Sequence, residues 1–232
     1  MSSKRERQAA RRAELEAKKS RRRFILGAGG VVALAGAGYG LSAFIAAPPP
    51  AQGALPFDPA SDIQDTDVVI GKADAPVTVV EYASLTCPHC ARFHNESLPE
   101  FLKGWVDTGK ARLVFRHYPL DGSALKAAAA VSCLDQQYRQ GAVSILFKNP
   151  GRWAPAQDPA AEALALLPLG AGEITRASAC VAEGVTTQKI MGPVAQARAG
   201  GVSSTPSFVI KGKVYPGFMS AEKLGALVDA AI

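Results

Sequence analysis

One unit in the sequence constrains the fold more than any other: a strand, a helix and a second strand, with two cysteines at the first turn. Residues 77–83 are rich in β-branched side chains, which favour strands. Residues 88–107 place apolar side chains on one helical face, and residues 111–118 have the composition of another strand. A unit of this size predicts two parallel strands joined by a right-handed crossover.

Between the first strand and the helix lies Cys87-Pro88-His89-Cys90. We expect Cys87 at the helix N-terminus, where unpaired N–H groups and the helix dipole favour a thiolate and lower the pKa of the thiol. Pro88 suits the first helical position, because the N–H that it lacks has no partner there in any case. A protonated His89 adds positive charge beside the sulfur. The pattern therefore predicts a reversible, redox-active disulfide between Cys87 and Cys90.

Two other uses of this cysteine pair are open. Cys87 and Cys90 could form half of a zinc site with His94, which lies four residues after Cys90 on the same helical face. The sequence has no second CxxC and no HxxxH pattern to complete a closed site. A purely structural disulfide is the other alternative, but a bridge within one turn constrains little chain and so stabilises little. We favour redox chemistry without a metal, and interpret His94 and His117 as structural.

The positive charge of the chain is concentrated at its N-terminus. Residues 1–23 hold ten Lys and Arg against three Glu, which leaves −1 of the net charge of +6 for the rest of the chain. A nucleic-acid-binding surface is therefore not indicated. The uncharged run at residues 24–47 would form a helix about 36 Å long, enough to cross a hydrocarbon core of about 30 Å. The preceding charge predicts a cytoplasmic N-terminus and export of the residues beyond this segment.

Two fates of this segment stay open. Residues 20–26, SRRRFIL, resemble a twin-arginine export signal, and the small residues before Ala54 suit cleavage. The length of residues 24–47 instead favours a retained anchor in the inner membrane. The proline-rich stretch at residues 48–66 predicts an extended linker to a domain that begins at residue 67.

Residues 121–200 form a long Ala-rich stretch without strand character, which predicts an inserted, all-helical subdomain. Helix-breaking residues divide it into four or five helices, with breaks at Gly141, residues 149–151, Pro168 and Gly184.

Strand character appears at three further places. Residues 68–70 predict a short edge strand before the central unit. Residues 207–210 and 214–215, separated by Lys-Gly-Lys, predict a hairpin. Residues 220–230 follow as a final helix whose first residue, Ser220, suits the N-cap position.

The remaining cysteines, Cys133 and Cys180, fall in predicted helices at residues 123–140 and 173–183. An even number of cysteines in an exported protein favours disulfides, and pairing of the CxxC cysteines leaves these two for each other. We expect a structural bridge that encloses about 46 residues and contributes a few kcal/mol. Two buried free thiols, or a relay role in disulfide exchange, are the alternatives.

Residues 80–90 (VEYASLTCPHC), the helical insertion and residues 202–208 (VSSTPSF) together resemble the DsbA-like thiol–disulfide oxidoreductases, exported bacterial proteins of the thioredoxin fold. The resemblance covers residues 67–232 in the family's order of elements. It implies an α/β fold with a central mixed sheet flanked by helices and an inserted all-helical subdomain, preceded by an N-terminal export or membrane segment. The second cysteine pair resembles the α-proteobacterial type of this family.

The resemblance also implies roles for the cysteine motif. Cys87 would be the exposed nucleophile and Cys90 its buried partner. Pro88 and His89 would set the redox potential, because the oxidants of the family carry this dipeptide where the reductants carry Gly-Pro.

Two further sites are implied by the same resemblance. Thr205 and Pro206 would form a cis-proline loop that faces the disulfide and binds substrate, although most X-Pro bonds are trans. Glu81 would be a buried carboxylate that passes protons to Cys90. The alternative for Glu81 is a solvent-facing strand residue.

The implied activity is oxidation of dithiols in reduced, unfolded exported proteins of the bacterial periplasm, with no metal or organic cofactor. A quinone-linked membrane protein of the DsbB type would reoxidise the enzyme. A disulfide isomerase or reductase on the same fold is one alternative, since threonine before Pro206 is shared with isomerases. Residues 48–66 are too short for the dimerisation domain that isomerases usually add. A non-enzymatic copper- or zinc-handling protein that uses Cys87, Cys90 and a histidine is the other alternative.

Overall fold

The computed structural model describes residues 58–232. The predicted segments at residues 1–23 and 24–47, and most of the linker, lie outside this range. Among the described residues, no helix combines the length and the apolar character needed to cross a bilayer.

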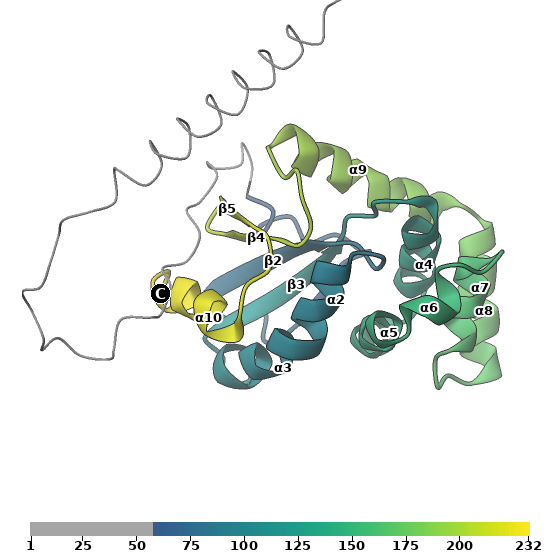
Figure 1. Cartoon of the computed structure of the whole chain (residues 1–232), viewed down its shortest axis with the longest axis horizontal. Helices are drawn as coiled ribbons and strands as arrows, with labels where there is room; N and C mark the ends of the chain where they lie inside the picture. Colours follow the sequence, from purple (N-terminus) through teal and green to yellow (C-terminus); the bar gives the residue numbers. More distant parts are fainter. Residues whose placement is uncertain (1–57) are drawn as a thin grey trace, which may run out of the picture. The chain divides into compact units, whose positions relative to one another are not determined.

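A five-stranded mixed sheet forms the centre of the domain (Figure 1). In spatial order the strands are β1 (Val68–Ile70), β3 (Ala111–His117), β2 (Val77–Ala83), β4 (Ser207–Ile210) and β5 (Lys213–Pro216). β2 and β3 run parallel, and all the other neighbouring strands are antiparallel. The predicted edge strand, parallel crossover and C-terminal hairpin are confirmed.

The crossover from β2 to β3 is one helical run with two wide turns. It consists of α2 (Pro88–Arg92), the π-helical η1 (Phe93–Ser97), α3 (Leu98–Phe101) and the π-helical η2 (Leu102–Val106). Pro99 lies in the first turn of α3, directly after η1. A π turn holds one extra residue and is wider than an α-helical turn. This width leaves room for the ring of Pro99, which, together with the lack of an N–H, would disrupt a regular α-helix.

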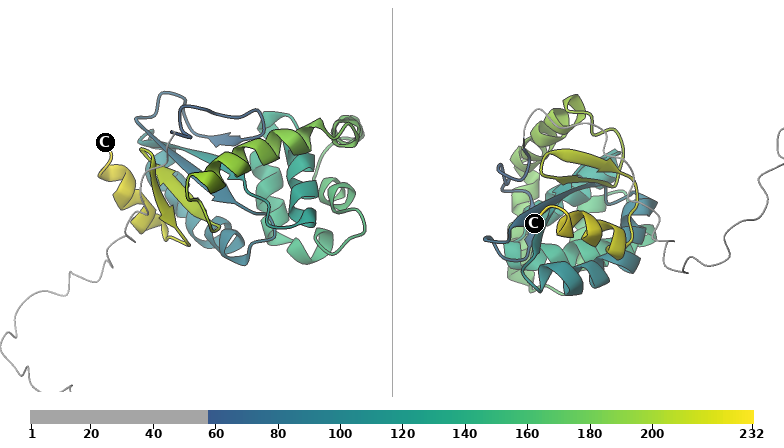
Figure 2. Two further views of the ribbon diagram at one scale, coloured as in Figure 1. Left: turned by 90° about the horizontal axis from the view of Figure 1, so that it is seen from above. Right: turned by 90° about the vertical axis from the view of Figure 1, so that its left-hand side faces the viewer.

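Helices cover both faces of the sheet (Figure 2). On one face, apolar residues of β2 and β3 pack against the crossover helices and α10 (Ala221–Asp229). On the other face, Val80, Tyr82 and Val114 pack against α4 (Gly122–Ser132) and α9 (Val185–Ala199). The central strand β2 is therefore buried on both sides, as parallel strands usually are.

The insertion between β3 and β4 consists of six helices, one more than the most that the sequence predicts. They are α4, α5 (Gln136–Lys148), α6 (Pro150–Trp153), α7 (Pro159–Ala165), α8 (Ala171–Ala182) and α9. The predicted break at Gly141 is wrong, because Gly141 lies inside α5 and the chain breaks after Ser132 instead. The guanidinium of Arg139 donates to the carbonyl oxygens of Ser132 and Leu134, which are left without helical partners at the end of α4.

Part of the predicted linker belongs to the folded domain. The buried guanidinium of Arg116 on β3 donates to the carbonyl oxygens of Pro59 and Asp62 and forms an ion pair with Asp67, 2.7 Å between Nη2 and Oδ2. A buried guanidinium needs acceptors for its several N–H groups. Residues 58–66 supply two of them, so the domain extends upstream of the predicted start at residue 67.

Candidate active site

Three loops meet at one edge of the sheet. The parallel strands β2 and β3 end there, and the antiparallel strand β4 begins there. The loop after β2 carries Cys87, and the loop before β4 carries Thr205 and Pro206. The Cys87 sulfur lies 3.4 Å from the Thr205 carbonyl oxygen, to which it can donate only when it is protonated, although the two residues are 118 positions apart. The Thr205–Pro206 peptide bond is cis. The fold thus brings the cysteine pair against the proline loop.

Cys87 is the N-cap residue of α2, with an extended backbone, and Pro88 follows in the first helical turn. Cys90 is fully buried one turn later. Cys87 itself is only 5% exposed, which corrects the expectation of an exposed nucleophile. One contact of the buried sulfur is the carbonyl oxygen of Thr205 in the proline loop. Pro88 and His89 are the exposed residues of the motif.

The two free thiols have opposite acidities. The pKa of Cys87 is lowered from 9.0 to about 5, chiefly because the Cys90 thiol donates a hydrogen bond to its sulfur. Burial opposes this effect, and the side chain of Thr205 and the backbone N–H groups of Cys90 and His89 add to it. The pKa of Cys90 is raised, chiefly by burial, with further contributions from the bond to Cys87 and the charge of Glu81. At neutral pH the site therefore holds a Cys87 thiolate beside a Cys90 thiol.

Glu81 lies on β2 and is completely buried. Its Oε2 is 2.9 Å from Nε2 of His94, which is 4% exposed at the side chain and belongs to η1. The other oxygen, Oε1, has no hydrogen-bond partner among the described residues. Glu81 thus lies where the resemblance places a buried carboxylate. The pairing with His94 was missed, and the only signal for it in the sequence is the position of His94 one turn after Cys90.

Sequence reasoning also missed a contact that fixes the active-site loop to the helical insertion. Thr86, next to Cys87, donates through Oγ1 to Oδ2 of Asp121 at 2.6 Å. The other oxygen of Asp121 caps α4 by accepting from the backbone N–H of Ala124. One carboxylate therefore holds both the cysteine loop and the first inserted helix, so that the orientation of one depends on the other.

The second cysteine pair forms a disulfide between Cys133, at the end of α4, and Cys180 in α8. It joins two helices of the insertion, and Thr186 of α9 lies 3.4 Å from the Cys133 sulfur. The bonded state leaves neither residue as a free thiol, in contrast to Cys87 and Cys90.

The other candidate residues have structural surroundings. His117 is buried at the end of β3, where burial and the nearby Arg139 lower its pKa to about 3, so it is neutral at ordinary pH. Within residues 58–232 no three His, Cys, Asp or Glu side chains are grouped so that they could hold a metal ion. His94 in particular faces the Glu81 carboxylate. The metal-handling alternative has no support from this geometry.

Comparison with known proteins identifies the family. Residues 64–230 match the family described as "Thioredoxin". A protein of Rickettsia felis named "Putative protein-disulfide oxidoreductase" is 30% identical over 176 residues, 73% of this chain. The structure of alpha-DsbA1 from Wolbachia pipientis has a TM-score of 0.62 at 27% identity, covering 71% of this chain and 90% of that one. The chain belongs to the thioredoxin family and is DsbA-like.

BdbD from Bacillus subtilis also has a TM-score of 0.62, over 73% of this chain and 96% of its own, but at 18% identity it supports the fold alone. The present chain spans about 62% of the length of the Rickettsia felis relative. The fold and family therefore rest on these comparisons, whereas the activity rests on the chemistry of the site.

Proposed function

We propose that this protein is an exported thiol–disulfide oxidoreductase that donates a Cys87–Cys90 disulfide to reduced, unfolded proteins in the bacterial periplasm. The observation that carries the proposal is the opposite acidity of the two thiols, a pKa of about 5 for Cys87 and a raised pKa for Cys90. A sulfur that is stable as a thiolate is a good leaving group. Cys87 has this property, and its partner does not.

The reaction proceeds in two exchange steps. A client thiolate attacks Cys87, the Cys87–Cys90 bond breaks, and its electron pair goes to Cys90, which takes up a proton. A second client thiolate then attacks the client sulfur of the mixed disulfide and expels Cys87 as a thiolate. The client is oxidised to a disulfide and the enzyme is reduced to a dithiol. Because the site stabilises the Cys87 thiolate, the equilibrium favours the reduced enzyme and makes the protein an oxidant.

The proline loop is the proposed client-binding element. The Thr205 carbonyl lies beside the reactive sulfur, so an extended chain that reaches Cys87 must pass along Thr205 and Pro206. His89 and Pro88 are exposed at the same rim and are proposed to set the redox potential. No organic cofactor enters either step.

The partners are inferred from electron balance and from the N-terminal sequence. The reduced enzyme must pass two electrons to an acceptor, and by resemblance this is a quinone-linked membrane protein of the DsbB type. The basic residues 1–23 and the uncharged residues 24–47 are proposed to direct export and to contact the inner membrane.

A disulfide isomerase or reductase on the same fold is the second candidate. Thr205 favours it, since isomerases of this fold share threonine at that position. The equilibrium constant with glutathione separates the two candidates. An oxidase requires a more oxidising potential than the glutathione pool, and a strongly reducing value would exclude it.

Disulfide transfer tests the proposed activity directly. The full-length oxidised protein is mixed with a reduced, unfolded protein that contains two cysteines, and the loss of client thiols is followed with time. We expect stoichiometric oxidation by the wild type and none by Cys87→Ser. The matched variant Cys90→Ser should not oxidise the client either, but it should accumulate a mixed disulfide at Cys87 when supplied with an oxidised client. A wild-type protein that leaves the client reduced would refute the proposal.

A further inference from the structure

The proposed mechanism requires proton transfer at a buried sulfur. Cys90 leaves as a thiolate when the disulfide opens, and it must lose a proton when the disulfide forms again. Because the pKa of Cys90 is raised mainly by burial, its thiolate is a high-energy species that needs a nearby acid or base. Glu81 is the acidic side chain that contributes to the raised pKa of Cys90. Glu81 is itself completely buried, so a route from it to solvent is needed.

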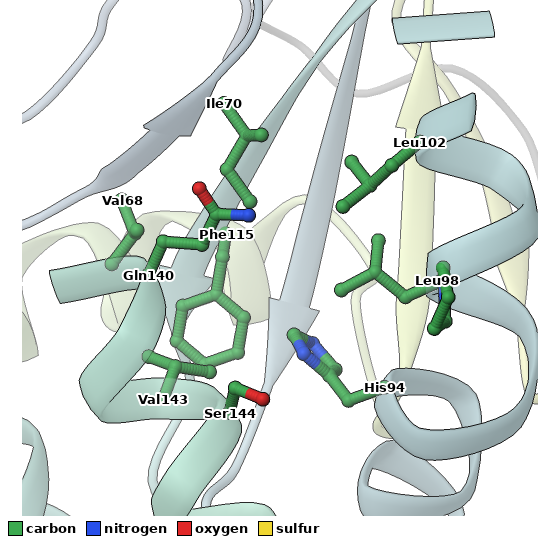
Figure 3. Close-up of a pocket in the computed structure, with 10 residues that line it drawn as sticks. Val68, Ile70, His94, Leu98, Leu102, Phe115, Gln140, Val143 and Ser144 are labelled. Carbon is green, nitrogen blue, oxygen red and sulfur yellow. The ribbon is translucent and has the colours of Figure 1, made fainter. Parts of the chain in front are cut away.

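His94 lies between Glu81 and an open cavity. Its Nε2 is 2.9 Å from Glu81 Oε2, and the same side chain lines a cavity of about 140 Å³. Figure 3 shows the His94 ring projecting from the crossover helix into the space that Phe115 and Ser144 also border. The rim includes the exposed residues Pro99 and Gln140. The cavity therefore extends from the surface to the imidazole.

This cavity is suited to a few water molecules. A single water occupies about 30 Å³ of liquid volume and needs polar partners. The Ser144 hydroxyl, the Gln140 amide and the His94 ring supply such partners in a wall that is otherwise largely apolar, with Val68, Leu98 and Phe115. The wall thus has polar groups that can hold water inside the cavity.

We propose that His94 is a positioning residue for the redox reaction, which relays protons between Glu81 and water in this cavity and so connects Cys90 to solvent. The inference rests on the proposed thiol–disulfide activity. When the disulfide opens, a proton from cavity water passes through the imidazole of His94 to the Glu81 carboxylate, and from Glu81 to the Cys90 thiolate. When the disulfide forms, the proton travels the opposite way and Cys90 attacks the mixed disulfide at Cys87. No electron passes through His94 in either direction.

Apart from Glu81, the described side chains that surround His94 are uncharged. The cavity wall contributed by β1 and α5 consists of uncharged side chains, Val68, Ile70, Gln140, Val143 and Ser144. The aromatic rings of Phe93, Phe115 and Phe147 pack around the imidazole. The other histidine of this region, His117, packs its ring against Phe115, with 5.0 Å between the ring centroids.

A reaction of the reduced full-length protein with dithiobis(nitrobenzoate) separates the two cysteines. Attack by the Cys87 thiolate releases the first nitrothiobenzoate, and attack by Cys90 on the mixed disulfide releases the second. The variant His94→Gln keeps an N–H donor for Glu81 but cannot relay a proton. We expect the first release to be unchanged and the second to slow about a hundredfold near pH 6, the lower end of the range for general acid–base effects. The loss should diminish as pH rises, because hydroxide replaces the relay.

Glu81→Gln and the double variant test whether the two residues act as one unit. We expect the double variant to be no slower in the second release than Glu81→Gln alone, whereas multiplied losses would overturn the relay. His117→Gln is the matched control for a buried histidine and should leave both releases unchanged. Unfolded molecules also react with the reagent, so the variants are compared only under conditions where circular dichroism shows each of them to be folded.

The outcomes separate the relay from the proposed function. An unchanged second release in His94→Gln, or equal slowing of both releases, would overturn the role of His94 and leave the dithiol chemistry intact. A wild-type protein that releases only the first product would refute the dithiol chemistry itself.

Discussion

The hydrogen bond from Cys90 to Cys87 gives the sharpest test of the active site, because it is the largest cause of the low pKa of Cys87. Cys90→Ala removes the donor, whereas Cys90→Ser replaces the thiol by a hydroxyl that still donates. A hydrogen bond to a charged group contributes about 1.5–3 kcal/mol, and about 1.4 kcal/mol corresponds to one pKa unit. A thiol is a weak donor, so the lower end applies. We expect the pKa of Cys87 to rise from about 5 to about 6 in Cys90→Ala and to stay near the wild-type value in Cys90→Ser.

The assay is a pH titration of the thiolate by its ultraviolet absorbance, with the rate of alkylation by iodoacetamide as a second measure. The chain has four cysteines, and the disulfide removes Cys133 and Cys180, so Cys87 is the sole titrating thiol in both variants. At pH 5 about half of the Cys87 in the wild type should be ionised, against about a tenth in Cys90→Ala. Equal midpoints in the alanine and serine variants would refute the assigned cause. A wild-type midpoint near 9 would refute the stabilised thiolate altogether.

Three further predictions concern stability. The pKa of Cys87 is about 5 in the folded reduced protein and 9.0 as an ordinary thiol, so the unfolded form binds one more proton between these pH values. The reduced form should therefore gain stability over the oxidised form as pH rises from 5 to 9. Thermal unfolding of both forms measures this difference. The pKa of the buried His117 is about 3 in the folded protein, against 6.5 for an ordinary histidine, so the unfolded form takes up a proton more readily. The free energy of unfolding of both the reduced and the oxidised form should therefore fall by about 2 kcal/mol as pH falls from 6.5 to 5. His117→Gln should remove this loss in denaturant titrations. Replacing Cys133 and Cys180 together by alanine should lower the free energy of unfolding by about 4 kcal/mol, the chain-entropy value for a loop of this size; an unchanged denaturant midpoint would contradict it.

The fold was predictable because local patterns and family motifs agree. The alternation of strands and helices predicts the sheet. The CxxC turn and the Thr-Pro loop lie far apart in the chain, yet both lie at the same edge of that sheet. Helix boundaries in the insertion were less predictable. Gly141 is a helix breaker by propensity, but it costs only about 1 kcal/mol in a helix. The side-chain bonds from Arg139 decide where α4 ends, and no local pattern reveals them.

The candidate site was predictable in its residues but not in their contacts. The motif indicates that Cys87 is acidic, because helix N-termini stabilise thiolates. It does not indicate that the Cys90 thiol is the principal cause, or that the Thr205 carbonyl contacts the sulfur. His94 was interpreted as structural because its partner is on another element, thirteen positions away. Such pairs depend on the register between a helix and a strand, which the π turn at residues 93–97 alters.

The narrow access to Cys87 has a consequence for selectivity. With only 5% of the residue exposed, a client sulfur can approach Cys87 along few directions. If the protein has the proposed function, this geometry would favour client cysteines on flexible chain over those held in folded domains. Selection of this kind would act through the shape of the site and would not require recognition of the client's sequence.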